Sequence, residues 1–135
     1  MKVLLDTDIL LDVALRREEF FADSAAILAW AEGEPGQSGI AWHSLSNIAY
    51  LLRPDARPFI KELLGFTEIP ATGTNAAKQA TGFPMKDLED SLQAAAALHF
   101  GAAYIITRNG THFRNSPVPA ITPKEFLRTM SRGGV

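Results

Sequence analysis

Acidic side chains gather at two places where they could hold a cation. Asp6 and Asp8 directly follow the apolar run "VLL", and Asp87, Glu89 and Asp90 open the segment "DLEDSLQAAAA". A helix cap needs only one acceptor side chain, so a second acid beside Asp6 suggests bound positive charge, although simple capping by Asp8 stays open. Helix N-termini favour carboxylates by about 0.3–1 kcal/mol each, so part of the second group needs no functional reason.

A third polar segment, "TRNGTHF" at residues 107–113, directly follows the apolar run "AYII". Parallel strands share one carboxyl edge, so Thr107, Asn109 and His112 are expected to emerge beside Asp6. Asp90 is expected to face a cleft. The core face of its helix is expected to consist of Leu88, Leu92, Ala95 and Ala96. If these groups converge, their hard oxygen ligands suit Mg²⁺ or Mn²⁺ better than zinc.

The elements that must position these residues alternate between short apolar runs and helical patterns, which is typical of an α/β fold with a mostly parallel sheet. Strands are expected at residues 2–5, 38–42, 66–69 and 103–106, with a short edge strand at 118–121. Helices are expected at 8–16, 20–32, 44–52, 56–64, 74–81 and 87–101, with a last one from Pro123. Asp8 and Ser44 are the expected N-caps, and Gly101 is expected to end its helix.

Composition narrows the class of protein. The 135 residues suffice for one domain, which we place at 1–135, and 47% hydrophobic with 21% charged residues is ordinary for a soluble chain. The absence of cysteine fits a cytoplasmic setting. A formal charge of −2 gives no global attraction to nucleic acid, so any such binding needs a local patch. The aromatic residues are expected in the core rather than in base stacking: Phe20, Phe21, Trp30, Trp42 and Tyr50.

Taken in order, these segments resemble PIN domains, a family of metal-dependent ribonucleases that includes the toxins of bacterial VapBC toxin–antitoxin pairs. The resemblance runs from "VLLDTDILLDVALRREEF" through "HSLSNIAYLL" and "DLEDSLQAAAALHFGAAYIITRN" to "FRNSPVPAITPKEFL". It implies a parallel β-sheet flanked by helices on both faces, with acids at the carboxyl edge holding Mg²⁺ or Mn²⁺. It further implies hydrolysis of RNA phosphodiester bonds, a cognate antitoxin as partner and a homodimer. No membrane association is expected, because no stretch approaches the roughly 20 apolar residues that a membrane span requires.

The resemblance also assigns roles to individual residues. The expected catalytic residues are Asp6, Asp90, Asn47 and Asn109. The expected metal ligands are Asp6, Asp90, Asp87 and Glu89. The residues expected to contact substrate are Thr107, Arg108, His112 and Arg16, and Thr107 is alternatively expected to hydrogen-bond the first aspartate.

Three positions depart from the family pattern. Asn47 and Asn109 stand where acids are expected, and His112 replaces an acid before the phenylalanine. An amide offers a carbonyl oxygen but no charge, so each exchange should weaken metal binding. An alternative is therefore a PIN fold with an inactive site, acting as an RNA-binding or protein-interaction module. A receiver-like signalling domain is disfavoured, because "TRN" stands where that class needs a lysine.

Overall fold

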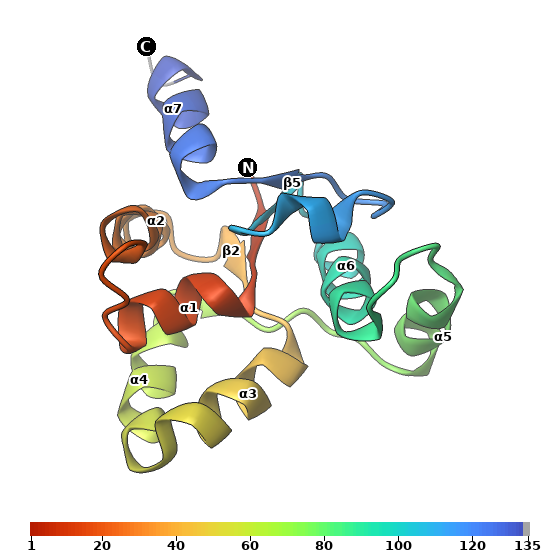
Figure 1. The fold of residues 1–135 in the computed structure, drawn as a ribbon, viewed down its shortest axis with the longest axis horizontal. Coiled ribbons are helices and arrows are strands. Elements are labelled where there is room, and N and C mark those ends of the chain that lie inside the picture. The colour runs from red at the N-terminus through yellow and green to blue at the C-terminus, as the bar shows by residue number, and fades with distance from the viewer. Residues whose placement is uncertain (134–135) are drawn as a thin grey trace.

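The computed structural model describes residues 1–133 (Figure 1). It contains five short parallel strands in the order β3-β2-β1-β4-β5. The strands are β1 (Val3–Leu5), β2 (Ser38–Gly39), β3 (Thr67–Glu68), β4 (Tyr104–Ile106) and β5 (Ala120–Ile121). All five lie inside the ranges expected from the sequence, and β5 is an edge strand as predicted. β1 lies at the centre and pairs with β2 and β4, so the residue after it is surrounded by other elements.

The helices also follow the expected order. They are α1 (Thr7–Ala14), α2 (Phe21–Gly33), α3 (Trp42–Leu52), α4 (Ala56–Leu63), α5 (Thr74–Gly82), α6 (Leu88–Phe100) and α7 (Pro123–Gly133). Two 3-10 helices, η1 (Arg53–Asp55) and η2 (Gly110–Phe113), complete the described part of the chain. Gly101 ends α6 in the left-handed conformation, with φ of 75°, as the sequence predicted.

Helices cover both faces of the sheet because successive side chains of β1 point to opposite sides. Val3 and Leu5 pack with residues of α1, α2 and α7, including Phe126, which is fully buried. Leu4 packs on the other face against the alanines of α6, such as Ala94. The predicted class, a parallel α/β sheet with flanking helices, is confirmed.

Two predicted helix caps are wrong. The N-cap of α1 is Asp6, whose carboxylate accepts a hydrogen bond from the Thr7 N–H at 2.8 Å, so Asp8 lies inside the first turn. α3 begins at Trp42, two residues before the predicted cap Ser44. The Ser44 hydroxyl instead lies 2.7 Å from the Thr7 hydroxyl, so a tertiary contact replaces the local one.

The predicted core face of α6 is also wrong in part. Leu88 is 56% exposed, whereas Ser91 and Gln93 are buried along with Ala94 to Ala97. The helix presents small residues to the sheet, which allows close approach. A Cβ added at Gly39 of β2 would lie 2.9 Å from the Phe100 ring, so a larger residue at this strand position would have to displace that ring.

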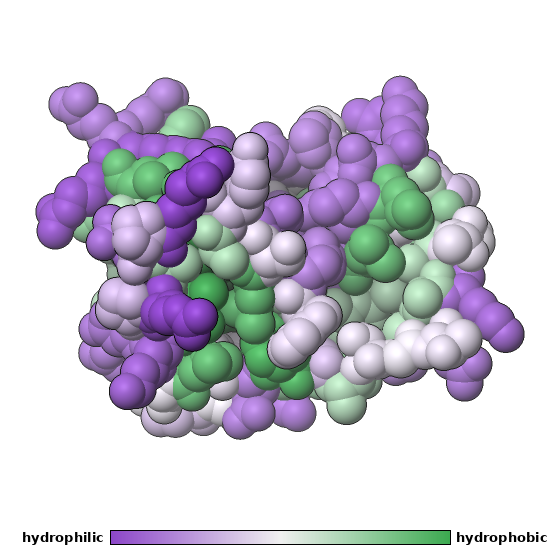
Figure 2. Space-filling model, turned by 90° about the horizontal axis from the view of Figure 1, so that it is seen from below, coloured by the Kyte–Doolittle hydropathy of each residue, from purple (hydrophilic) through white to green (hydrophobic). Residues whose placement is uncertain are grey.

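The aromatic residues divide between core and surface. Trp30 packs edge-on against Phe126 with ring centroids 4.9 Å apart. Trp42 and Tyr50, both expected in the core, are about 70% exposed on α3. Figure 2, which views the molecule from the α3 and α4 side, shows apolar surface gathered on this face. Within residues 1–133 no helix has both the length and the apolar character needed to cross a membrane.

Candidate metal centre

The first wall of the centre is built where β1 ends and α1 begins. The backbone N–H of Asp6 donates to the Ile106 carbonyl of β4 at 3.0 Å, which fixes the residue at the carboxyl edge of the sheet. Its carboxylate caps α1 and also accepts a hydrogen bond from the Thr107 hydroxyl at 2.7 Å. Three elements therefore hold Asp6 in one orientation.

Asp8 lies in the first turn of α1, two residues after Asp6 and at the same edge of the sheet. Its Oδ2 accepts hydrogen bonds from the Asn109 amide at 2.9 Å and from the Arg108 backbone N–H at 3.3 Å. Its other oxygen, Oδ1, is buried and has no hydrogen-bond partner among residues 1–133. A buried carboxylate oxygen without a partner is costly, so this atom is suited to a ligand.

The second wall is the first turn of α6. Asp87 caps this helix by accepting from the Asp90 N–H at 3.2 Å. Asp87, Glu89 and Asp90 each place one carboxylate oxygen within 4.8 Å of the others. Two histidines flank the group from other elements: His43 Nε2 of α3 is 3.5 Å from Glu89, and His112 Nδ1 of η2 is 3.6 Å from Asp90.

Electrostatics show that the acids are crowded. Burial, reinforced by the neighbouring Asp8 carboxylate, raises the pKa of Asp6 to about 7. Burial and the charges of Glu89 and Asp87 raise the pKa of Asp90 to about 6. Burial likewise raises the pKa of Asp8. The His43 imidazole instead lowers the pKa of Glu89. Because the Glu89 charge also raises the pKa of Asp6, the two walls act on one another.

These groups fit a divalent cation. The donors are hard carboxylate oxygens, they carry more negative charge than their surroundings neutralise, and one buried oxygen of Asp8 has no partner in the described chain. Mg²⁺ and Mn²⁺ prefer such ligands and are commonly held by one or two carboxylates while keeping several waters.

Arg108, expected to contact substrate, is partly buried and held by a carboxylate of the protein itself. Its guanidinium bonds both oxygens of Asp12, at 2.7 and 3.1 Å, and stacks on the Phe20 ring at 3.8 Å. Asp12 is fully buried and also accepts from the Ser24 hydroxyl at 3.0 Å. This pair, which we call the Asp12–Arg108 clamp, anchors the loop that presents Thr107 and Asn109.

A second buried network joins the helices behind the centre. The Gln93 amide of α6 donates to the Thr7 hydroxyl at 3.0 Å and to the Ser44 hydroxyl at 2.8 Å. Two of its three members neighbour a site residue: Thr7 follows Asp6, and Gln93 lies one turn after Glu89. The sequence reading missed Gln93 and Asp12. In both cases the available signal was a polar residue within a helical stretch that is otherwise apolar.

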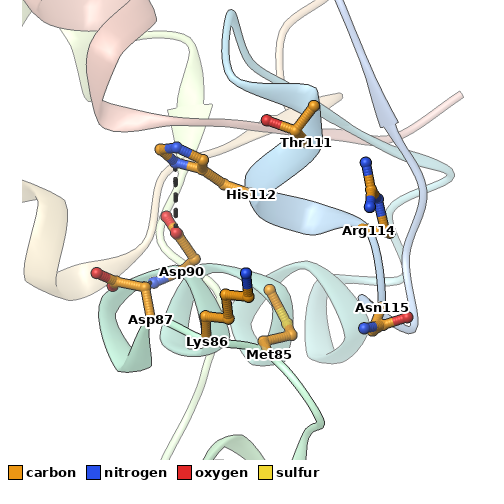
Figure 3. Close-up of a pocket in the computed structure, with 8 residues that line it drawn as sticks. All are labelled: Met85, Lys86, Asp87, Asp90, Thr111, His112, Arg114 and Asn115. Carbon is orange, nitrogen blue, oxygen red and sulfur yellow. Dashed lines mark hydrogen bonds and ion pairs between the residues drawn. The ribbon is translucent and has the colours of Figure 1, made fainter.

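The remaining residues expected at the site differ in their burial and in their contacts. Asn47 is exposed on α3 and shares a hollow with Thr7, and no hydrogen bond joins it to a carboxylate within residues 1–133. Thr107 is fully buried against Asp6. Arg16 is exposed and lies over the Phe21 ring at 5.6 Å. Of the four residues expected to contact substrate, only His112 lines the cavity beside Asp90 (Figure 3).

Fold and site together define a parallel α/β protein with an acidic centre at the carboxyl edge of its strands. A family model described as "PIN domain" matches residues 2–111. The chain therefore belongs to the PIN domain family. The resemblance found in the sequence is confirmed.

Solved structures share the fold at low sequence identity. A chain of a toxin–antitoxin complex from Klebsiella pneumoniae is 21% identical with a TM-score of 0.67, and the match covers 90% of this chain and 98% of that one. A chain of VapBC2 from Rickettsia felis, bound to a DNA fragment from its promoter, is 16% identical with a TM-score of 0.63 and the same coverages. A chain of FitAcB from Neisseria gonorrhoeae is 16% identical with a TM-score of 0.61, and the match covers 90% of this chain and 98% of that one. No curated protein matches the chain significantly.

Proposed function

We propose that this chain is a metal-dependent endoribonuclease that hydrolyses RNA phosphodiester bonds, and that it is the toxin of a type II toxin–antitoxin pair. The observation that carries the nuclease proposal is the cluster of Asp87, Glu89 and Asp90, whose Glu89 charge reaches Asp6 at the carboxyl end of β1. PIN domains are generally metal-dependent nucleases, which supports the same reading.

Asp6, Glu89, Asp90 and the partnerless Oδ1 of Asp8 would hold the ion, with Asp87 adding negative charge nearby. A divalent cation supplies Lewis-acid stabilisation of phosphoryl charge and activates water as a nucleophile. The chain's own polar residues keep the carboxylates in place. Thr107 donates to Asp6, and Asn109 donates to Asp8, so this asparagine orients an acid instead of replacing one.

The uncharged amide of Asn109 therefore does not by itself argue against activity, because it holds the Asp8 carboxylate in place. The five acids of the two walls exceed the one or two that magnesium sites commonly use. We propose Mg²⁺ or Mn²⁺ as the cofactor on this basis.

The direct test is cleavage of labelled structured RNAs by purified protein in Mg²⁺ or Mn²⁺. We expect cleavage that stops in EDTA and falls by at least about a hundredfold in Asp90→Asn, because removing one carboxylate weakens both metal binding and its orientation. The exposed Asp55→Asn variant is the matched control, since it removes one carboxylate from η1, outside both acidic walls, and should cut normally.

A cooperatively melting protein that cuts no RNA in either metal would contradict the nuclease proposal. It would favour the second candidate, a PIN fold retained as an RNA-binding or protein-interaction module. The exposed Asn47 is the observation behind that candidate, because the α3 position expected to carry an acid presents an amide with no hydrogen bond to a carboxylate in residues 1–133.

The proposed partners follow from the neighbours. Two of the similar solved structures are toxin–antitoxin assemblies, which supports an antitoxin as partner. RNA as substrate, a homodimer and a cytoplasmic setting remain parts of the proposal. Exposed Trp42 and Tyr50 on α3 supply the kind of apolar surface that a homodimer interface needs.

A further inference from the structure

Gln93 is a fully buried polar side chain at the point where α1, α3 and α6 meet (Figure 1). Its amide nitrogen donates to the Thr7 hydroxyl of α1 at 3.0 Å and to the Ser44 hydroxyl of α3 at 2.8 Å. The two hydroxyls lie 2.7 Å apart, so the three side chains form a closed triangle of hydrogen bonds. One residue of α6 is therefore bonded to both of the other helices.

Gln93 also connects the two acidic walls of the centre. In the second wall it lies four residues after Glu89 on α6, a spacing that places two side chains next to each other on a helix. The His43 imidazole is the main cause of the lowered pKa of Glu89, and the neighbouring Gln93 amide lowers this pKa further. In the first wall its bonded partner Thr7 directly follows Asp6, and the Thr7 N–H donates to the Asp6 carboxylate at 2.8 Å.

Packing alone does not account for an amide at this position. The buried residues that follow it on α6 are alanines, and the Oε1 atom of Gln93 is buried without a hydrogen-bond partner in residues 1–133. A buried polar atom without a partner is costly, whereas an apolar side chain of similar volume, such as methionine, carries no such cost. The Thr7 and Ser44 hydroxyls can bond each other without Gln93, because they already lie within hydrogen-bond distance. These features indicate a role other than stability.

We propose that Gln93 is a positioning residue of the metal centre, which fixes Glu89 relative to Asp6 so that both walls bind one cation. The inference rests on the proposed metal-dependent function and deepens it by naming an uncharged residue on which the site depends. Groups that orient metal ligands commonly change metal affinity by about 10- to 100-fold when they are mutated. Ser44 belongs to the same network, because its hydroxyl holds the Gln93 amide from α3.

The test measures Mn²⁺ binding to the folded protein and needs no RNA. Electron paramagnetic resonance detects free Mn²⁺, so a titration well below the melting temperature gives Kd directly. We expect Gln93→Met to raise Kd by at least about tenfold, because Glu89 loses the group that orients it. The midpoint of urea denaturation in EDTA should stay close to that of the wild type, because methionine fills the same space and the two hydroxyls keep each other as partners.

Thr67→Val is the matched control. Thr67 is another buried polar residue, and its hydroxyl donates to the Leu63 carbonyl at 2.7 Å. It lies on the edge strand β3, level with Val3 at the start of β1, whereas Asp6 follows the end of β1. Loss of this hydrogen bond should lower the urea midpoint and leave the Mn²⁺ Kd unchanged. The control therefore separates metal-site geometry from general loosening of the fold.

Ser44→Ala provides a second variant. Alone it should raise Kd less than Gln93→Met does, because Thr7 still holds the amide. Added to Gln93→Met it should raise Kd no further, because both residues act through the same amide. A further rise in the double variant would overturn the proposed network.

Three other results would overturn the inference: a Kd in Gln93→Met equal to that of the wild type, an equal rise of Kd in Thr67→Val, or a Gln93→Met protein that does not fold. A wild type that binds no Mn²⁺ would reject the metal centre together with the inference.

The result is separable from the nuclease proposal. A raised Kd in Gln93→Met, from a protein whose wild type binds Mn²⁺ but cuts no RNA, would keep the positioning role and reject the enzyme. Metal-dependent cleavage by the wild type, together with an unchanged Kd in Gln93→Met, would keep the enzyme and reject the positioning role.

Discussion

Burial and close negative neighbours raise the pKa of Asp6 to about 7, which makes the free energy of unfolding depend on pH. In an unfolded chain the same group titrates near 3.8, so the folded state binds more protons between these two values. The stabilisation is fully present below about pH 4 and is lost as the pH rises through about 7. Asp90, with a pKa of about 6, contributes in the same direction.

We therefore expect the metal-free protein to be harder to unfold at pH 5.5 than at pH 8, and we expect Asp6→Asn to flatten this dependence. Each pKa unit corresponds to about 1.4 kcal/mol, so the change is large enough to measure. Urea denaturation in EDTA at several pH values provides the measurement, with Asp55→Asn as the control carboxylate. A dependence that stays as steep in Asp6→Asn would show that other groups cause it.

At the level of elements, the Asp12–Arg108 clamp connects α1, the start of α2 and the loop between β4 and η2. Replacing Arg108 with Met leaves the fully buried Asp12 with only the longer contact to Arg17, at 3.4 Å, as its cation partner. Removing one member of a buried pair typically costs about 3–5 kcal/mol, whereas replacing both members by apolar residues costs much less. We expect Arg108→Met to destabilise strongly and the double variant with Asp12→Leu to recover part of the loss.

A double-mutant cycle by urea denaturation measures this coupling, and Arg57→Met on the surface of α4 controls for the loss of a cation. Additive effects of the two substitutions would refute the clamp. A second readout is Mn²⁺ affinity, which should fall in Arg108→Met because the clamp positions the loop that donates to Asp6 and Asp8.

Most strands and helices could be predicted from the sequence, because apolar runs and helical periodicity indicate which residues are buried. The order of strands and helices and the end of α6 at Gly101 all agree with it. The errors share one cause, since each concerns a residue whose surroundings are decided by distant elements: some find a tertiary partner, and others are left exposed. Ser44 bonds Thr7 rather than its own helix, and Trp42 starts α3 on an open face.

In the candidate site, too, features set by the local sequence were predictable, and features set by distant partners were not. The proximity of Asp6, Thr107 and Asn109 was predictable, because the carboxyl ends of neighbouring parallel strands meet at one edge. The pairing of Arg108 with Asp12 was not predictable, since an arginine beside polar residues has the same local pattern whether it binds phosphate or a buried carboxylate. Gln93 likewise acquires its partners only when α1, α3 and α6 come together.

At the scale of the whole molecule, the centre joins segments about eighty residues apart, since its walls come from residues 6–8 and 87–90 and its loop from residues 107–109. A cation that binds both walls binds only the folded chain, so it must stabilise the fold by mass action, by about 2.7 kcal/mol at a concentration one hundred times Kd. We expect Mg²⁺ and Mn²⁺ to raise the melting temperature by several degrees.

Thermal melting with increasing Mn²⁺ gives the measurement, and it needs no knowledge of the RNA target. Asp90→Asn should lose most of the shift because it removes one wall's ligand, and Asp55→Asn should keep it. The metal should also reverse the pH dependence of the acids, since a bound cation replaces the protons that relieve their repulsion. Stability in saturating Mn²⁺ should then rise from pH 5.5 to pH 8, and a continued fall would mean that the two walls do not bind one ion together.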